Sequence, residues 1–295
     1  MKEDKLKGLM WGSLLGDAYS LGGHWVYDQN ELNNSQLNFK GLNNPLSSYH
    51  LEKKAGDFTH YGDQTVWLLE HINHAKIYEP YEYSQVWQKK MSNYKGYVDG
   101  ASKESLGNLN NGASFMSAGS NSQDLSVIGR HAPIIFSISN MDDIVDFVKF
   151  HTCLTHMSKE MLDASKYIVE ITLAMLYDLD LESTLKERAK FYGEVVEAEV
   201  KKAFELRDMP TNEAINTLGA SCGMQGALAS TIHLLLNYHD DFDALLKVNV
   251  LAGGDSSARA MVAGMIVGAR YGFEAIKPSW IEEINDYERL NGFIG

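Results

Sequence analysis

The sequence has few of the residues that cross-link chains or interrupt helices: among 295 residues there are two cysteines and five prolines. Cys153 and Cys222 are too few for a disulfide framework, and their apolar, helix-like surroundings favour packing roles in a reducing cytosol, so we expect a cytoplasmic protein. Long apolar runs are also missing. The first apolar segment meets Asp17 soon after Leu15, which makes it a poor signal peptide and too short to span a bilayer.

Basic residues are the next scarce class. Lys and Arg number 26 against 39 Asp and Glu, giving a net charge of −13, and no local Lys/Arg cluster reverses this balance. Such a chain is a poor partner for a phosphate backbone, so we expect no nucleic-acid binding. The lack of a long apolar run likewise gives no reason to expect a membrane partner. The sequence leaves the oligomeric state open.

Alternating strand patterns are scarce, whereas helical periodicity dominates the chain. The length permits one large domain or two tight ones, but no shift in composition marks a boundary. We therefore predict an all-α, single-domain multi-helix bundle covering residues 1–295. The predicted helical segments are 5–19, 65–76, 142–151, 159–178, 181–207, 212–237, 241–251 and a final one at 256–272.

Two features modify this helical pattern. Residues 28–59 and 107–129 lack a helical period, and such long segments in a compact domain are usually functional loops or disordered. Glycines recur at i, i+4 in two helical segments: Gly8, Gly12 and Gly16 in one, Gly264 and Gly268 in the other. This spacing predicts close backbone packing of the two helices in a soluble core, which would bring Asp17 and Asp255 into one neighbourhood.

Two short motifs place an aspartate at the expected start of a helix. The first is Gly62-Asp63-Gln64-Thr65, and the second is Gly253-Gly254-Asp255-Ser256-Ser257-Ala258. The plainest interpretation of each aspartate is a helix N-cap. A cap still leaves a carboxylate oxygen free, so the two residues could also bind one hard cation if they lie close together beside a cleft, as we expect.

Together with Gly16-Asp17-Ala18, Arg130-His131-Ala132-Pro133 and Thr155-His156, these motifs resemble the ADP-ribosylglycohydrolase family from about residue 6 to residue 272. The resemblance implies the family's all-α fold and a site in which Thr-Asp-Asp-Thr and Gly-Gly-Asp-Thr-Asp-Thr segments supply carboxylates to two Mg²⁺ ions. Here Gln64 and Ser257 replace two of those carboxylates, and Asp63 and Asp255 remain. Since Mg²⁺ gives up its water reluctantly, a full dinuclear site is not expected, and Asp63 and Asp255 would hold one weakly bound Mg²⁺ ion at most.

The same resemblance nominates the remaining site residues. His24 stands near the point where the family commonly has a catalytic Glu, so His24, Asp28 and Asp63 are the catalytic candidates, with His24 suited to acid–base chemistry near neutral pH. The ligand-binding candidates are Asp17, Gln64, Arg130, His156, Ser256 and Ser257. Two of these candidates also have a structural interpretation: Pro133 suits a helix start beside Arg130, and the Thr155-His156 pair suits a polar contact between helices. Cys222 has no identifiable base partner and is expected to pack in the core.

His24-Trp25-x-Tyr27-Asp28 and Tyr61-Gly62-Asp63-Gln64 narrow the resemblance to the branch with jellyfish J-type crystallins and selenoprotein J. The first functional hypothesis is a divergent hydrolase of an N- or O-glycosidic bond to an ADP-ribose-like ligand. The second is an inactive binding or structural protein with a crystallin-like role. The substituted motifs favour the second hypothesis, whereas the retained Asp63 and Asp255 favour the first.

Overall fold

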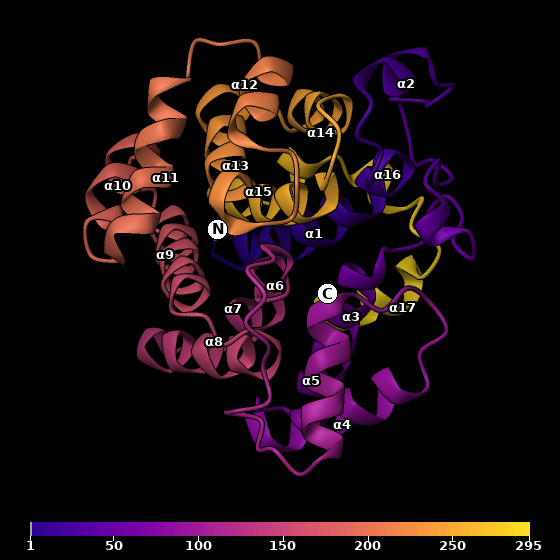
Figure 1. Ribbon diagram of the computed structural model, residues 1–295, viewed down its shortest axis with the longest axis vertical. Coiled ribbons are helices and arrows are strands. Elements are labelled where there is room, and N and C mark those ends of the chain that lie inside the picture. The colour runs from indigo at the N-terminus through magenta and orange to yellow at the C-terminus, as the bar shows by residue number, and fades with distance from the viewer. Residues whose placement is uncertain (1) are drawn as a thin grey trace.

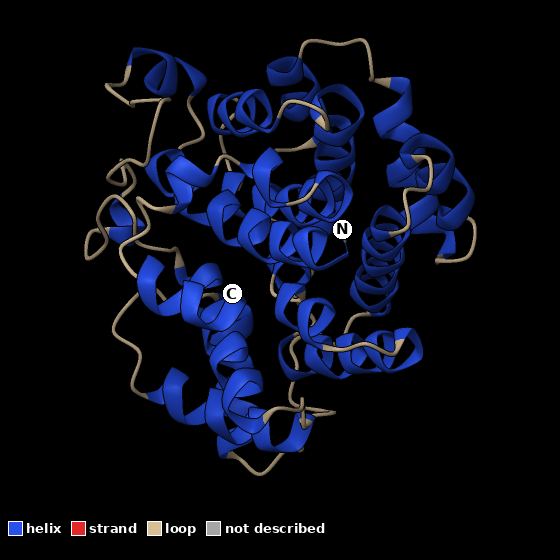
Figure 2. Cartoon of the chain, turned by 180° about the vertical axis from the view of Figure 1, so that it is seen from behind, coloured by secondary structure: helices blue, strands red, loops and turns tan. Residues whose placement is uncertain are grey.

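The computed structural model describes residues 2–295, apart from the side chains of residues 141 and 142. Within this range the chain forms helices and loops, and its only extended pairings are two isolated bridges, so the all-α prediction is confirmed (Figure 2). None of the described helices combines the length and apolar character needed to cross a bilayer. The helices are α1 (Lys2–Ser20), η1 (Leu21–Gly23), α2 (Gln29–Asn34), η2 (Ser48–His50), α3 (His60–Ala75), α4 (Pro80–Ser92), α5 (Gly100–Asn110), α6 (Ser126–Gly129), α7 (Ala132–Ser137), α8 (Met141–Thr155), α9 (Lys159–Leu176), α10 (Leu181–Ala189), α11 (Gly193–Glu205), α12 (Thr211–Leu218), α13 (Met224–Tyr238), α14 (Phe242–Leu251), α15 (Ser256–Tyr271), η3 (Phe273–Ile276), α16 (Pro278–Ile281) and α17 (Tyr287–Ile294).

The centre of the molecule is the pair α1 and α15, which lie side by side along most of their length (Figure 1). Their backbones approach so closely that a Cβ atom added to Gly12 would lie 2.2 Å from the carbonyl oxygen of Gly264. A Cβ atom on Gly268 would lie 2.0 Å from the carbonyl oxygen of Gly8. The close packing predicted from the glycine spacing is therefore confirmed, and only glycine fits at these contacts.

The other helices surround this pair. α9, α13 and α14 pack against α15, whereas α3 and α7 pack against α1. Figure 1 shows α8–α11 along one side of the central pair and α3–α5 below it. The N-terminal ends of α3 and α15, together with the loop after α1, are the parts of this scaffold that position the candidate site.

Several predicted boundaries were wrong. Residues 181–207 form two helices, because the chain turns at Gly193, which has a φ of +83°. Residues 212–237 are likewise divided, since Gly219 with a φ of +114° ends α12 before α13 begins. The 256–272 segment is followed by further short helices, and α2 and η2 lie within the segment predicted to be irregular. A helical period continues across a glycine turn, so periodicity alone does not reveal these breaks.

Candidate functional site

Asp255 is fixed by a glycine turn at the start of α15. It is the N-cap of that helix, its side chain accepts a hydrogen bond from the backbone N–H of Ala258, and its own N–H donates to the Ala220 carbonyl at 2.8 Å. Gly253 and Gly254 precede it with φ values of +79° and +71°. A Cβ atom on Gly254 would lie 2.0 Å from the Ala220 oxygen, so the turn requires glycine at this position.

The loop after α1 brings His24 to Asp255. Backbone hydrogen bonds of 2.8 Å run from the Trp25 N–H to the Gly254 oxygen and from the Gly254 N–H to the Val26 oxygen. His24 Nδ1 then lies 3.5 Å from Asp255 Oδ1, and both side chains are fully buried. Burial lowers the pKa of His24 well below its usual value, helped by the neighbouring His50, His60 and Arg259. The imidazole is therefore neutral and meets the carboxyl group as a polar neighbour.

The residue opposite Asp255 is Asp124, which lies in the segment 107–129 that we predicted to be irregular. The hydroxyl group of Tyr61 lies between the two, 3.1 Å from Asp255 Oδ2 and 3.4 Å from Asp124 Oδ2. Asp124 is oriented by the backbone N–H of Ser126, which donates to its Oδ1 at 2.9 Å. The two carboxyl groups and the Tyr61 hydroxyl form what we call the Asp124–Asp255 pair.

Cys222 joins this pair from the loop between α12 and α13. Its carbonyl oxygen accepts the N–H of Leu125 at 2.9 Å, and its sulfur lies within 4.8 Å of a carboxylate oxygen of both Asp124 and Asp255. Burial, Asp124 and Asp255 raise the pKa of the thiol to about 12, so it stays protonated and is a poor nucleophile. The expectation of a helical core cysteine was wrong, because Cys222 is half-buried in a loop at the site.

Burial raises the pKa values of both acids in the pair. The pKa of Asp124 is raised to about 7 by burial, by Asp255 and by Asp99. The pKa of Asp255 is also raised, mainly by burial, although Ala258, Arg259 and Tyr61 oppose the shift. Two carboxylates in one buried site cannot easily both ionise, so near neutral pH one group is protonated and the other is charged.

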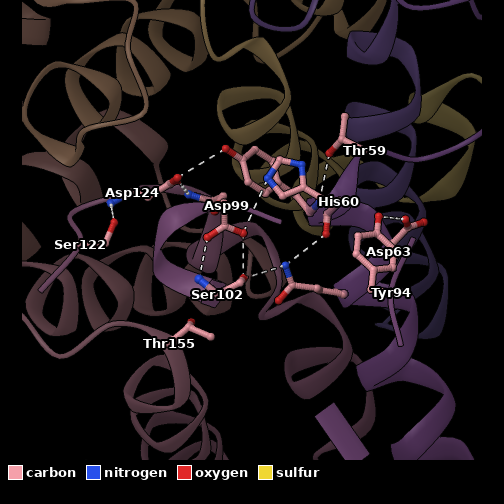
Figure 3. A network of polar contacts seen from close by, with 12 residues as sticks. Thr59, His60, Asp63, Tyr94, Asp99, Ser102, Ser122, Asp124 and Thr155 are labelled. Atoms are coloured by element: carbon pink, nitrogen blue, oxygen red, sulfur yellow. Dashed lines mark hydrogen bonds and ion pairs between the residues drawn. The ribbon is translucent and has the colours of Figure 1, made fainter. Parts of the chain in front are cut away.

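Asp63 has a different set of partners. It lies inside the first turn of α3, whose N-cap is Thr59, so the N-cap interpretation of Asp63 was wrong. Its Oδ2 accepts hydrogen bonds from Lys53 Nζ at 2.5 Å and from the Tyr94 hydroxyl. Residues i and i+2 point in nearly opposite directions on a helix, so Tyr61 faces Asp255 while Asp63 faces Lys53. Figure 3 shows Asp63 and Tyr94 on one side of the polar network and Asp124 on the other. The metal-binding donor atoms that cluster with Asp255 in the described residues come from Asp124 and Cys222, and Asp63 is not among them.

Asp17 is buried beneath the start of α3. Its two oxygens accept the backbone N–H of Thr59 at 2.7 Å and the Thr59 hydroxyl at 2.6 Å. Its Oδ2 also fills the space beside Gly62, where an added Cβ atom would lie 2.3 Å away. Burial raises the pKa of Asp17 to about 7. Asp17 thus supports the turn that carries Tyr61 and Asp63.

Gln64, Arg130 and His156 form a separate buried network. Gln64 Oε1 accepts Trp87 Nε1 at 2.9 Å and a guanidinium N–H of Arg130. Arg130 also donates to the Thr155 hydroxyl at 3.1 Å, and that hydroxyl lies 2.9 Å from His156 Nδ1. Burial and Arg130 lower the pKa of His156 to about 3, so it is neutral. These contacts join helices, as the structural interpretation of the Thr155-His156 pair anticipated, and Pro133 lies at the start of α7 beside Arg130.

The remaining candidates differ in their access to the pair. Asp28 is exposed and caps α2 by accepting the Asn30 N–H at 2.8 Å. Ser257 lies beside His24, with its backbone N–H 3.4 Å from His24 Nδ1. The hydroxyl groups of Ser256 and Ser257 are buried and have no hydrogen-bond partner among the described residues. The two serines therefore belong to the neighbourhood of Asp255, whereas Asp28 serves the local chain turn.

Four aromatic side chains near the Asp124–Asp255 pair, Trp25, Tyr27, Tyr49 and Tyr97, form what we call the aromatic rim. The Trp25 ring contacts the rings of Tyr49 and Tyr97 at centroid distances of 5.1 and 4.9 Å. Tyr27 and Tyr49 are more than half exposed. Next to the rim, His50 Nε2 lies 3.2 Å from His60 Nδ1. The other ring nitrogen of His60, Nε2, lies 3.7 Å from Asp99 Oδ2. Burial lowers the pKa values of these two histidines to about 4 and about 3, so both rings are neutral.

Sequence reasoning missed Asp124, Tyr61, Asp99 and Lys53 as members of the site. Asp124 and Lys53 had one signal, because each lies in a long segment that we predicted to be irregular and therefore of functional interest. Tyr61 lies two residues before Asp63 and was quoted only as part of a motif.

The donor groups that are present do not fit a pair of Mg²⁺ ions. Asp63 is already paired with Lys53, and the Gln64 oxygen that replaces a carboxylate already accepts two donors. Asp124, Asp255 and Cys222 are the one group in the described part of the chain whose donor atoms are close enough for a shared ion. That group contains a thiol, whereas Mg²⁺ prefers oxygen ligands alone.

Comparison with known proteins gives a consistent picture. A family model described as ADP-ribosylglycohydrolase matches residues 1–294. Crystallin J1A of Tripedalia cystophora is 23% identical over 299 residues, which cover 95% of this chain and 91% of that protein. ADP-ribosylhydrolase ARH3 of Mus musculus is 23% identical over 195 residues, which cover 55% of this chain and 53% of that protein. A solved structure described as an ADP-ribosylglycohydrolase-related protein complex has a TM-score of 0.73 at 18% identity, covering 99% of this chain and 96% of that chain, and this similarity concerns the fold.

Proposed function

The chain belongs to the ADP-ribosylglycohydrolase family, and from this premise we propose that it hydrolyses a glycosidic bond to an ADP-ribose-like ligand without a Mg²⁺ pair. The observation that carries the proposal is the Asp124–Asp255 pair, two buried acids on either side of one tyrosine hydroxyl. Paired carboxyl groups of different protonation are the usual means of cleaving a glycosidic bond.

The proposed chemistry gives the two carboxyl groups different roles, and an oxygen of one lies within 4.8 Å of an oxygen of the other, which is too close for direct attack by a water held between them and suits a retaining reaction. Asp124, in its protonated form, donates its proton to the leaving nitrogen or oxygen while the Asp255 carboxylate attacks the sugar carbon, so the bond to the leaving group breaks as a bond to Asp255 forms. Asp124, now ionised, then takes a proton from a water whose oxygen replaces Asp255 on the sugar carbon, which consumes one water and returns both groups to their starting state. The Tyr61 hydroxyl lies within hydrogen-bonding distance of both carboxyl groups and fixes their relative positions. Neutral His24 contacts the other oxygen of Asp255.

The aromatic rim fits a ligand of this class. Tyrosine and tryptophan rings stack on nucleobases and on the apolar faces of sugars, and the Tyr27 and Tyr49 side chains are exposed beside the pair. Since Asp255 is fully buried, the proposed reaction requires neighbouring side chains to move before a substrate can reach it. Asp28 and Asp63, the two other catalytic candidates from the sequence, have no place in this scheme because each is engaged elsewhere.

The test is a hydrolysis screen over N- and O-linked ADP-ribosyl substrates, in EDTA and with added Mg²⁺, Mn²⁺ or Zn²⁺. The proposal expects turnover in EDTA that falls at least about a hundredfold in Asp124→Asn and in Asp255→Asn. Asp28→Asn is the matched control and should keep the parent rate. Turnover that needs added Mg²⁺, or that survives Asp255→Asn, would contradict the proposed chemistry.

A second candidate function is a binding or structural role without turnover. The buried, covered position of both acids favours it, as does the similarity to a protein named as a crystallin. In that case no substrate is cleaved in the screen, while ADP-ribose itself either binds, with quenching of Trp25 fluorescence, or does not bind. Binding without cleavage indicates a binding protein, and the absence of both indicates a structural role.

A further inference from the structure

Lys53 makes an unusually enclosed ion pair next to the family motif at Asp63. The side chain of Lys53 is 14% exposed and that of Asp63 is 18% exposed, so the pair is largely shielded from water. The ammonium nitrogen lies 2.5 Å from Asp63 Oδ2, and the Tyr94 hydroxyl donates to the same oxygen. A turn holds the backbone of Lys53 in place, since its N–H donates to the His50 oxygen at 2.9 Å.

A second carboxylate lies on the other side of the same helical turn. Asp17 Oδ2 touches the Gly62 position, one residue before Asp63, and Lys53 interacts electrostatically with Asp17 as well. Two acids and one ammonium group thus share a largely enclosed region, in which Asp17 is fully buried and Lys53 and Asp63 are mostly shielded. Removing the ammonium would leave negative charge without compensation, which is costly in a buried site.

We propose that Lys53 is a tethered cation that occupies the place at Asp63 where the family resemblance puts a divalent metal ion. Mg²⁺ would need to sit about 2.1 Å from the carboxylate oxygen, and the Lys53 nitrogen already occupies that approach. A lysine delivered by the chain itself loses no translational freedom on pairing, whereas a free ion must be captured from solution and partly dehydrated. Lys53 and a divalent ion therefore compete for Asp63, which explains why Asp63 is present although Gln64 and Ser257 have replaced other family carboxylates.

The test compares Lys53→Met with the parent protein, using Mn²⁺ as the probe in thermal melts and calorimetric titrations. In EDTA, Lys53→Met should melt below the parent, and Mn²⁺ should raise its melting temperature by about 4 °C at a hundredfold excess over Kd. The parent should show no such rise. Adding Asp63→Asn to Lys53→Met should abolish Mn²⁺ binding, which places the ion at Asp63.

Two control variants test whether a response to Mn²⁺ is specific to the loss of the Lys53 charge. Lys90→Met removes a more exposed ion pair, with Glu70 at 2.7 Å, and Mn²⁺ should not raise its melting temperature. Lys53→Arg keeps the positive charge, and Mn²⁺ should not raise its melting temperature either.

The proposal is overturned if the parent binds Mn²⁺ at a site that Asp63→Asn removes, or if Lys53→Met responds to Mn²⁺ no more than Lys90→Met does. A Lys53→Met protein that stays unfolded at every Mn²⁺ concentration also counts against it, because the ion should then replace the ammonium. These measurements record binding and melting, so their outcome is separate from whether the protein cleaves a glycosidic bond.

Discussion

Gly62 stands where the family motif has threonine, and the structure indicates that this position cannot accept even a methyl group without loss. A Cβ atom at residue 62 would lie 2.3 Å from Asp17 Oδ2 and 2.8 Å from the Cβ atom of Phe58. The second contact comes from the base of a side chain, which cannot rotate away. Gly62→Ala should therefore displace Asp17 from its two hydrogen bonds with Thr59.

The expected cost follows from three contributions. Overpacking a well-filled interior costs about 1–3 kcal/mol. Weakening the buried hydrogen bonds of Asp17 costs about 1–3 kcal/mol more. Alanine returns at most about 1 kcal/mol through its better helix propensity. The free energy of unfolding should fall by about 3 kcal/mol. For 295 residues the unfolding entropy is about 0.6 kcal/mol/K, so the melting temperature should fall by about 5 °C.

The assay is a thermal or denaturant melt of Gly62→Ala beside Gly107→Ala. Gly107 also lies within a helix, α5, but nothing approaches its Cβ position within 4 Å. Gly107→Ala should therefore raise stability by about 0.5–1 kcal/mol. In an Asp17→Ala background, the cost of Gly62→Ala should shrink, since the carboxylate is no longer displaced. If Gly62→Ala is as stable as Gly107→Ala, the contact with Asp17 does not limit this position.

Three further predictions concern charge in the buried site. The pKa of Asp17 is about 7 in the folded protein and about 3.9 in an unfolded chain, so between these pH values the folded state binds an extra proton. The free energy of unfolding should therefore fall as pH rises from about 4 to 7, by up to about 1.4 kcal/mol per pH unit from this group. Asp17→Asn should remove this slope in denaturant melts over the same range. Gln64→Asp with Ser257→Asp should lower the melting temperature in EDTA, because the shorter aspartate side chain at position 64 draws its acceptor oxygens away from Trp87 and Arg130. The double variant should respond more strongly to Mg²⁺ than the parent, and an equal response would show that the missing carboxylates do not limit binding. Arg259→Met should cost about 3–5 kcal/mol in a urea melt, since its guanidinium group is buried and donates to the Gly253 oxygen at 2.5 Å; a loss below 1 kcal/mol would show that the glycine turn holds without it.

The sequence predicted the scaffold better than the site. The i, i+4 glycines of α1 and α15 specify a close contact that depends on local spacing, and the structure contains it. The capping role of Asp255 is likewise local, since the residues that form the glycine turn are adjacent to it in sequence. Such features can be predicted because their cause lies within a few residues.

The partners of the site residues could not be predicted in the same way. Tyr61 meets Asp255 across 194 positions of sequence, and Asp124 reaches both through a loop without a periodic pattern. Asp63 was mistaken for a cap because Thr59, four residues earlier, was the true one. Two residues of difference on a helix reverse the direction of a side chain, which is why the carboxylate of Asp63 faces Lys53.

The contact between α1 and α15 also has a consequence for how the protein folds. It joins the beginning of the chain to residues 256–271, so the central contact closes a loop that contains most of the sequence. Contacts between distant residues slow folding, because the entropy of closing the loop is lost before the contact forms. During synthesis α1 is made long before residues 256–271, so its glycine face cannot pack against α15 until those residues have been added. Asp255 lies at the start of the same late helix, so the site and the core are completed in one step.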